Sequence, residues 1–187
     1  MVTITINDKE FTVEEGKTVL EVALDAGIRI PHLCYHPELE PYAACRLCLV
    51  EVIKRGWSSL QPACVYKVFD GLIVKTDTER VLKTRKIIFE LMLARVPHSE
   101  RIRELAAEYG VTGTRIRLKE EKENCILCGL CTRACAEVSQ RHAISFAMRG
   151  GKRTIQTPYN EVSETCIGCG ACAYLCPTGR IKIEEAE

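Results

Sequence analysis

Apolar and polar positions alternate along much of the first 77 residues. "VTITI" alternates, "ND" supplies a turn and "EFTV" alternates back, which predicts a β-hairpin. The following "TVLEVALDAG" has a helical period, with a capping box formed by Thr18 and Glu21 and a stop at Gly27. "CLVEVIK" and "GLIVKT" predict two more strands. Residues 1–77 are therefore expected to form a small α+β domain.

The pattern becomes helical over residues 78–118. Apolar residues recur at helical spacing until Pro97, and again between Ser99 and Gly110. The expected apolar faces are Val81, Ile88 and Leu91 in the first helix, and Ile102, Leu105, Ala106 and Tyr109 in the second. We interpret the many lysines and arginines of this helical connector as solvated helix faces, with a partner-docking surface as the alternative.

Residues 119–187 contain an internal repeat. "CILCGLCTRAC" and "CIGCGACAYLC" share the spacing C-x2-C-x2-C-x3-C, and each is followed by a short apolar segment, "HAISF" or "RIKIEE". This self-similarity predicts a duplicated loop–helix–strand unit forming a C-terminal domain.

Composition and charge narrow the class of protein. Twenty-six basic residues against 25 acidic ones give a formal charge of +1, which gives no reason to expect nucleic-acid binding. No segment has the 18 or more apolar residues that would span a bilayer, and the N-terminus lacks the features of an export signal. We therefore expect a cytoplasmic protein without membrane insertion. Twelve cysteines in such a compartment favour metal binding over disulfides.

The repeated motif has the spacing of bacterial ferredoxins. Three cysteines at two-residue gaps wrap a tight loop around a cubane, and the fourth starts a helix that leads to the other cluster. Zinc is the alternative, but a zinc site of four cysteines usually takes two separated C-x2-C pairs. Pro177 completes one copy of the motif, whereas Ala136 replaces the proline of the other. The expected ligands are Cys125, Cys128, Cys131 and Cys176 for the first 4Fe–4S cluster, and Cys166, Cys169, Cys172 and Cys135 for the second.

The N-terminal cysteines, Cys34, Cys45, Cys48 and Cys64, are less decisive on spacing alone. Their one close pair leaves structural zinc open, and the plant-type 2Fe–2S spacing C-x4-C-x2-C is matched only loosely. A Rieske centre needs two imidazoles on one iron, and "CRLC" offers no histidine. We therefore interpret the two nearby histidines, His32 and His36, as neighbouring or surface residues and not as ligands.

Longer stretches carry a family resemblance. "IPHLCYHPELEPYAACRLCLVEV", "QPAC" and "TDTERVLKTRKIIFELML", followed by the two ferredoxin motifs, resemble the large iron–sulfur subunit of respiratory complex I. They are equally similar to iron-only hydrogenases, NAD-linked formate dehydrogenases and the diaphorase moieties of NAD-reducing hydrogenases. The resemblance covers essentially the whole chain. It implies a β-grasp 2Fe–2S domain with the ligands Cys34, Cys45, Cys48 and Cys64.

The resemblance also exposes an absence. Relatives commonly hold a further cluster after the connector with one histidine and three cysteines, whereas "VPHSERIRELAAEYG" keeps only His98. We interpret His98 as part of the helix entry, and expect one 2Fe–2S cluster and two 4Fe–4S clusters.

The function implied by the resemblance is electron transfer. The chain would relay single electrons between a flavin-containing NAD(P)-linked subunit and a further redox subunit of a hetero-oligomeric oxidoreductase, of which electron-bifurcating enzymes are one kind. With all 12 cysteines as ligands, and without a dinucleotide fingerprint, P-loop or H-E-x-x-H motif, we expect no catalytic residue and no substrate site in the chain itself. The alternatives are a free-standing polyferredoxin and an iron–sulfur sensor.

Overall fold

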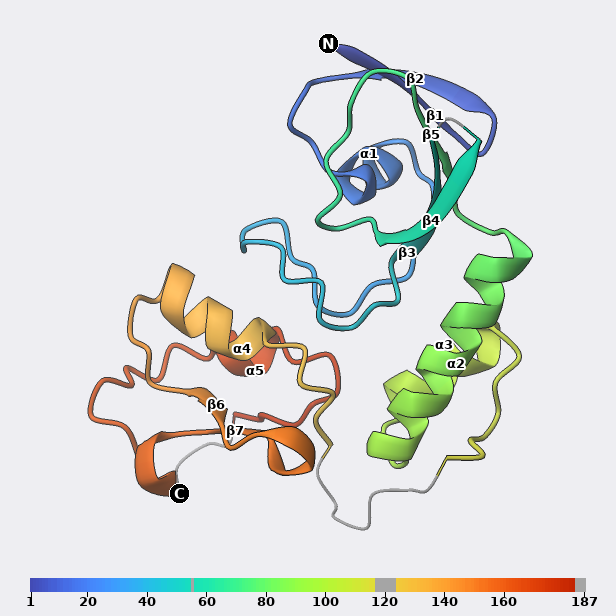
Figure 1. The fold of residues 1–187 in the computed structure, drawn as a ribbon. Coiled ribbons are helices and arrows are strands. Elements are labelled where there is room, and N and C mark those ends of the chain that lie inside the picture. The colour runs from blue at the N-terminus through green and yellow to red at the C-terminus, as the bar shows by residue number, and fades with distance from the viewer. Residues whose placement is uncertain (55, 117–123, 184–187) are drawn as a thin grey trace.

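The structure is a computed structural model, and it describes residues 1–54, 56–116 and 124–183. Figure 1 shows a sheet with one helix at the N-terminal end, a pair of helices beside it, and a C-terminal part with two short helices over two short strands. A mixed sheet combined with separate helical segments confirms the predicted α+β class.

The N-terminal sheet has five strands in the order β2-β1-β5-β3-β4. β1 and β5 run parallel, and the other neighbours are antiparallel. With α1 packed against it, this sheet is the expected β-grasp arrangement. The strands are β1 (Val2–Ile6), β2 (Lys9–Val13), β3 (Leu49–Lys54), β4 (Trp57–Pro62) and β5 (Leu72–Lys75). β4 was not predicted, because "WSSLQP" lacks a clear alternation of apolar residues.

Helix α1 (Val19–Asp25) has the ends that its sequence predicts. The Thr18 hydroxyl accepts a hydrogen bond from the N–H of Glu21, and the Glu21 carboxylate accepts one from the N–H of Thr18. At the other end, the N–H of Ile28 bonds the carbonyl of Ala23, and Gly27 has a φ of +69°. This pattern is a Schellman motif, which glycine accommodates without strain.

The connector consists of α2 (Glu79–Arg95) and α3 (Glu100–Glu108). α3 buries the face that was predicted. The prediction for α2 was partly wrong, because Leu91 is exposed and the buried face is formed by Val81, Arg85, Phe89 and Met92. Arg85 was included among the solvated cations, but only 3% of its surface is exposed.

The C-terminal part confirms the helices of the repeat but only one of its strands. α4 (Leu130–Arg133) continues into a π-helical turn, η1 (Ala134–Val138), and α5 (Ala171–Tyr174) follows the second motif. β6 (Ser145–Ala147) follows the first motif and pairs with β7 (Thr154–Gln156), which was not predicted. Residues 180–183 form no strand, and the end of the predicted "RIKIEE" segment lies outside the described residues. Two short 3₁₀ turns, η2 (Gly150–Lys152) and η3 (Pro158–Asn160), complete this part.

Two hydrophobic cores hold the chain together. One lies between the sheet and α1. The other contains Phe89 of α2 and Ile102 of α3, together with Cys34 of the N-terminal part and Cys128 of the C-terminal part. The connector therefore shares a core with both cysteine-bearing parts and does not act as a spacer between them. The predicted boundary between residues 118 and 119 lies outside the described residues.

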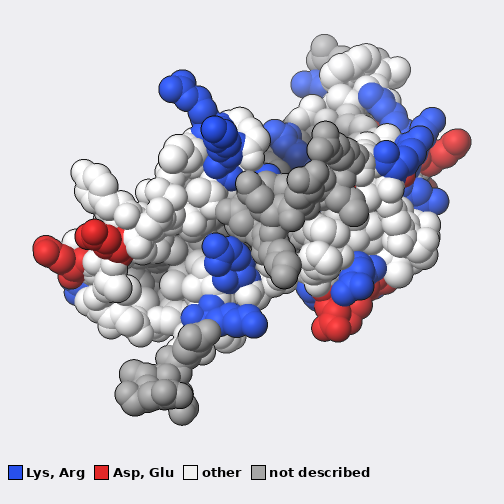
Figure 2. Space-filling model, turned by 90° about the horizontal axis from the view of Figure 1, so that it is seen from below, with Lys and Arg blue, Asp and Glu red and all other residues white. Residues whose placement is uncertain are grey.

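The surface is mixed in charge. Figure 2 shows Lys and Arg side chains, separated by uncharged ones, over the face seen from below, with fewer Asp and Glu side chains near its edges. Among the described residues, none of the helices is long and apolar enough to cross a membrane.

Candidate metal centres

The four N-terminal cysteines lie together at one end of the sheet. Cys34, Cys45 and Cys48 belong to the segment between α1 and β3, and Cys64 follows β4. All four are buried. Hydrogen bonds with Cys45 and Cys64 lower the pKa of Cys34 to about 2, and the same contacts raise the pKa values of both partners. The four sulfur atoms lie close enough to share protons, as the sulfur ligands of one metal group would.

The loop between these cysteines has an unusual backbone. Ala43 and Arg46 have positive φ values of 54° and 60°, and the N–H of Cys45 donates to the sulfur of Cys34 at 3.3 Å. Turns of this kind aim successive N–H groups inward, where they can meet anionic sulfur. The two nearby histidines have other partners: His32 Nδ1 lies 2.9 Å from the carbonyl oxygen of Ile30, and His36 Nδ1 accepts from the N–H of Glu38.

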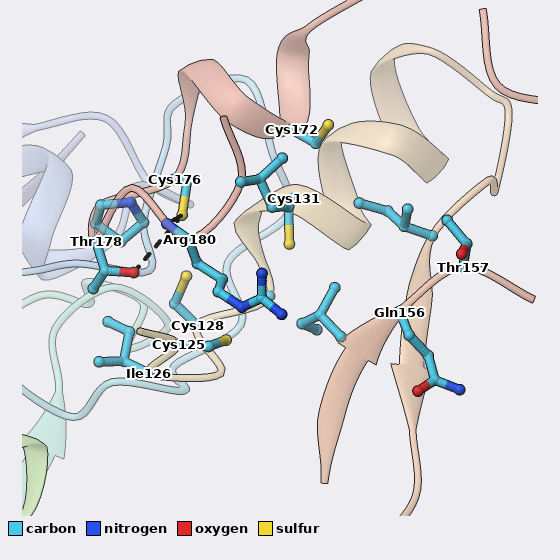
Figure 3. A pocket seen from close by; sticks show the side chains of 15 residues that line it. Cys125, Ile126, Cys128, Cys131, Gln156, Thr157, Cys172, Cys176, Thr178 and Arg180 are labelled. Atoms are coloured by element: carbon cyan, nitrogen blue, oxygen red, sulfur yellow. Dashed lines mark hydrogen bonds between the residues drawn. The ribbon is translucent and has the colours of Figure 1, made fainter. Parts of the chain in front are cut away.

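One group of C-terminal cysteines surrounds a cavity of about 230 Å³. Figure 3 shows the sulfur atoms of Cys125, Cys128, Cys131 and Cys176 facing this space, and the side chain of Arg180 extending beside them. Three of these cysteines come from the first motif and one comes from the second. Cys172 of the second motif also lines this cavity, so the cavity contains the predicted crossed set together with one further cysteine.

The complementary set lines a second cavity, of about 660 Å³, formed by Cys135, Cys166, Cys169 and Cys172. Again three cysteines come from one motif and the fourth from the other. Cys166 and Cys169 are exposed, in contrast to the buried N-terminal group. The Ser139 hydroxyl lies 3.3 Å from the sulfur of Cys169 and lowers its pKa.

The backbone of both motifs keeps N–H groups beside the sulfurs. Gly129 and Gly170 precede α4 and α5, and each has a φ of +75°. Four sulfurs also receive N–H donors: Leu127 to Cys125, Ala143 to Cys135, Arg180 to Cys176 and Cys45 to Cys34, at 3.2 to 3.4 Å. Such donors stabilise thiolate ligands and tune the potential of a bound cluster.

Burial keeps two of the first-cavity thiols neutral while no metal is bound. It raises the pKa of Cys128 to about 11 and is the main cause that raises that of Cys131 to about 12. All twelve cysteines are free. Within the described residues, no group of three or more His, Cys, Asp or Glu side chains is arranged to hold a single metal ion. The eight C-terminal cysteines line wider cavities, whose size and sulfur donors fit multi-atom iron–sulfur clusters.

A direct contact joins the N-terminal cysteine loop to the first motif. Arg133, which lies between Cys131 and Cys135, donates from Nη2 to the carbonyl oxygen of Cys34 at 2.7 Å and from Nη1 to that of Glu40. Glu137, one turn later, accepts from the N–H of Glu40 at 2.8 Å. Arg46 also lies next to a cysteine of the N-terminal group, Cys45. Arg46 is exposed, whereas Arg133 grips the loop.

Aromatic packing reinforces this contact. The ring of Tyr42 stacks with that of Phe146 on β6, with centroids 6.3 Å apart, and the guanidinium of Arg133 lies 5.6 Å from the Tyr42 ring centroid. A Cβ atom on Gly129 would lie 3.1 Å from Phe146 and 3.5 Å from Tyr42. Glycine at this position therefore serves both the helix entry and the close approach of the two rings.

Comparison with known proteins shows which protein families the chain resembles. A model described as a 2Fe-2S iron-sulfur cluster binding domain matches residues 1–79, and one described as a 4Fe-4S dicluster domain matches residues 124–180. The chain is therefore an iron–sulfur protein with a 2Fe–2S domain and a 4Fe–4S dicluster domain. The resemblance predicted from the motifs is confirmed, because the relatives include NADH-quinone oxidoreductase and NADP-reducing hydrogenase subunits.

Three curated relatives show the extent of the similarity, each aligned over 97% of this chain. An NADH-quinone oxidoreductase subunit of Rhizobium meliloti is 31% identical, with 24% of that protein covered. NADP-reducing hydrogenase subunit HndD of Solidesulfovibrio fructosivorans is 31% identical, with 36% covered. NADPH-Fe(3+) oxidoreductase subunit alpha of Geobacter sulfurreducens is 31% identical, with 24% covered. The chain thus spans between about a quarter and a third of the length of these relatives.

A solved structure supports the arrangement of both domains. A chain of NAD+-reducing [NiFe]-hydrogenase, crystallised in the H2-reduced state, superposes with a TM-score of 0.83 at 28% sequence identity. The alignment covers 95% of this chain and 85% of that one. An alignment of this length includes the 2Fe–2S domain, the helical connector and the dicluster domain.

The contact between the two domains predicts that adding one methyl group at Gly129 lowers the free energy of unfolding. Gly129→Ala should destabilise the protein more than Gly71→Ala, because both positions have a φ of +75° but only Gly129 has atoms within 4 Å of the added Cβ. The shared backbone strain costs about 1–2 kcal/mol, and crowding adds about 1–3 kcal/mol at Gly129 alone. Denaturant unfolding of both anaerobically purified variants measures the difference. Equal losses would show that the rings tolerate a methyl group there.

Proposed function

We propose that this chain is a three-cluster electron-transfer subunit of an NAD(P)-linked oxidoreductase complex. One 2Fe–2S cluster is held by Cys34, Cys45, Cys48 and Cys64. The dicluster domain holds one 4Fe–4S cluster on Cys125, Cys128, Cys131 and Cys176, and the other on Cys135, Cys166, Cys169 and Cys172. Clusters of these types supply one-electron redox chemistry at potentials that the protein sets.

The observation that carries the proposal is the shared core between the sites. Cys34 and Cys45 lie in the same buried cluster as Cys128 and Leu130 of the first motif. Cysteines proposed as ligands of the 2Fe–2S cluster and of a 4Fe–4S cluster therefore belong to one buried hydrophobic cluster. The second 4Fe–4S site adjoins the first, because Cys172 lines both cavities. Three adjoining sites form a continuous path for electrons.

Exposure distinguishes the two ends of this path. The 2Fe–2S ligands are 6% exposed or less, whereas Cys166 and Cys169 reach the surface. Nearby apolar side chains, Ile167 and Val138, are each 58% exposed. An exposed cluster with an apolar rim suits exchange with a further redox subunit. Such a hetero-oligomeric complex, with a flavin-containing NAD(P)-linked subunit as another member, is the setting in which we place this chain, in the cytoplasm.

Cluster content tests the ligand sets. Anaerobically purified protein should contain about ten irons, from one 2Fe–2S and two 4Fe–4S clusters, with a matching amount of acid-labile sulfide. Cys176→Ser should alter the same 4Fe–4S EPR signal as Cys125→Ser, and Cys135→Ser should alter the other signal, together with Cys166→Ser. Stoichiometric zinc without labile sulfide would refute the cluster assignment. If Cys135→Ser instead altered the signal that Cys125→Ser alters, the crossed ligation would be wrong.

Isolation from cells that produce the protein natively tests its place in a complex. We expect an affinity-tagged chain to bring down a flavoprotein in fixed ratio, and NADH or NADPH to reduce the clusters only in that assembly, since the described residues show no dinucleotide fingerprint. Purified chain without the flavoprotein should remain oxidised with either nucleotide. Recovery as a monomer with its clusters intact, and no associated flavin, would favour the free-standing polyferredoxin instead.

A further inference from the structure

Arg85 lies behind the N-terminal cysteine group and has no role in the sequence-based account. It projects from the middle of α2 toward the end of the loop that carries Cys45 and Cys48. Its Nε donates to the carbonyl oxygen of Leu47 at 3.1 Å, and its Nη2 donates to that of Leu49 at 2.8 Å. The guanidinium thus hydrogen-bonds the two residues on either side of Cys48.

The charge of Arg85 is buried, and no carboxylate forms an ion pair with it among the described residues. Its closest aromatic neighbour is Tyr109 of α3, whose ring centroid lies 6.0 Å from Cζ. Burial lowers the pKa of Arg85, and Tyr109, Cys48 and the carboxylate of Asp77 partly offset that effect. Burying a cation without an ion-pair partner costs free energy, so a further negative charge close to Arg85 would stabilise this site.

The proposed 2Fe–2S cluster would supply this negative charge, and the inference rests on that part of the proposed function. A 2Fe–2S cluster with four thiolate ligands carries a net charge of about −2 when oxidised and about −3 when reduced. We propose that Arg85 is a positioning residue that raises the reduction potential of the 2Fe–2S cluster. Its fixed cation stabilises the reduced cluster more than the oxidised one, because the attraction grows with the negative charge.

The location of Arg85 makes this effect selective. The guanidinium contacts the peptide groups around Cys48 and none of the residues that line the two dicluster cavities. Interactions between buried charges are screened far less than those between charges in water. The 2Fe–2S potential should therefore respond to Arg85, while the 4Fe–4S potentials should change little.

Neighbouring Lys86 provides a matched control. It lies one residue further along α2 and is exposed to solvent. Lys86→Met therefore removes one positive charge from the same helix, but a charge that is not buried. Arg85→Met removes the charge and both hydrogen bonds, Arg85→Gln keeps a neutral donor, and Arg85→Lys keeps the charge. Anaerobic redox titration of the whole holoprotein, followed by EPR, measures the midpoint potential of each cluster.

We expect Arg85→Met and Arg85→Gln to shift the oxidised-to-reduced ratio of the 2Fe–2S cluster about tenfold toward oxidised at a fixed potential. For a one-electron couple this is a midpoint about 59 mV lower. Arg85→Lys should restore most of the wild-type value, and Lys86→Met should match the wild type. If Arg85→Met fails to retain the cluster, Arg85→Gln decides the question.

Two results would overturn the inference. A wild-type midpoint in Arg85→Gln would show that the hydrogen bonds matter and the charge does not. Equal shifts of all three clusters would show a general disturbance of the fold. Neither result would touch the proposed function, which fails separately if the wild-type protein gives no 2Fe–2S signal at all.

Discussion

The contact between the Cys34–Cys48 loop and the rest of the molecule is the constraint on which the structure depends. The sheet holds one end of this loop, Arg85 of α2 holds the residues around Cys48, and Arg133 of the first motif holds the carbonyl of Cys34. Each of these contacts uses backbone atoms of the loop, so the loop has a defined path although it contains no regular secondary structure. The positions of the N-terminal sulfurs follow from that path.

The same contact explains why three chemically separate sites form one unit. Helices α2 and α3 supply the apolar side chains of a core that also includes cysteines from both domains. Because this core is continuous, the domains cannot separate without exposing it to water, which costs about 25 cal/mol for each Å² of apolar surface. A rigid arrangement keeps redox centres at constant separation, which electron transfer through a chain of clusters requires.

Sequence patterns predicted the parts of the molecule that depend on local rules. The hairpin turn and the Thr18–Glu21 capping box follow from short-range spacing, and the structure contains both. The ferredoxin spacing also predicts which cysteines share a site, and the two cavities contain these cysteines, with Cys172 lining both. Long-range contacts could not be predicted in this way. Nothing in "TRKIIF" distinguishes buried Arg85 from exposed Lys86, and nothing in "CTRAC" indicates that Arg133 reaches a loop about a hundred residues earlier in the chain.

The shared core brings the proposed 2Fe–2S site and the first proposed 4Fe–4S site next to each other. Magnetic coupling between the two reduced clusters tests it most directly. The EPR spectrum and spin relaxation of the 2Fe–2S signal can be recorded first at a potential that reduces this cluster alone, and then at one that reduces all three. Adjacent paramagnets should broaden or split the signal and accelerate its relaxation in the second sample. An identical 2Fe–2S signal at both potentials would place the clusters far apart and contradict this account.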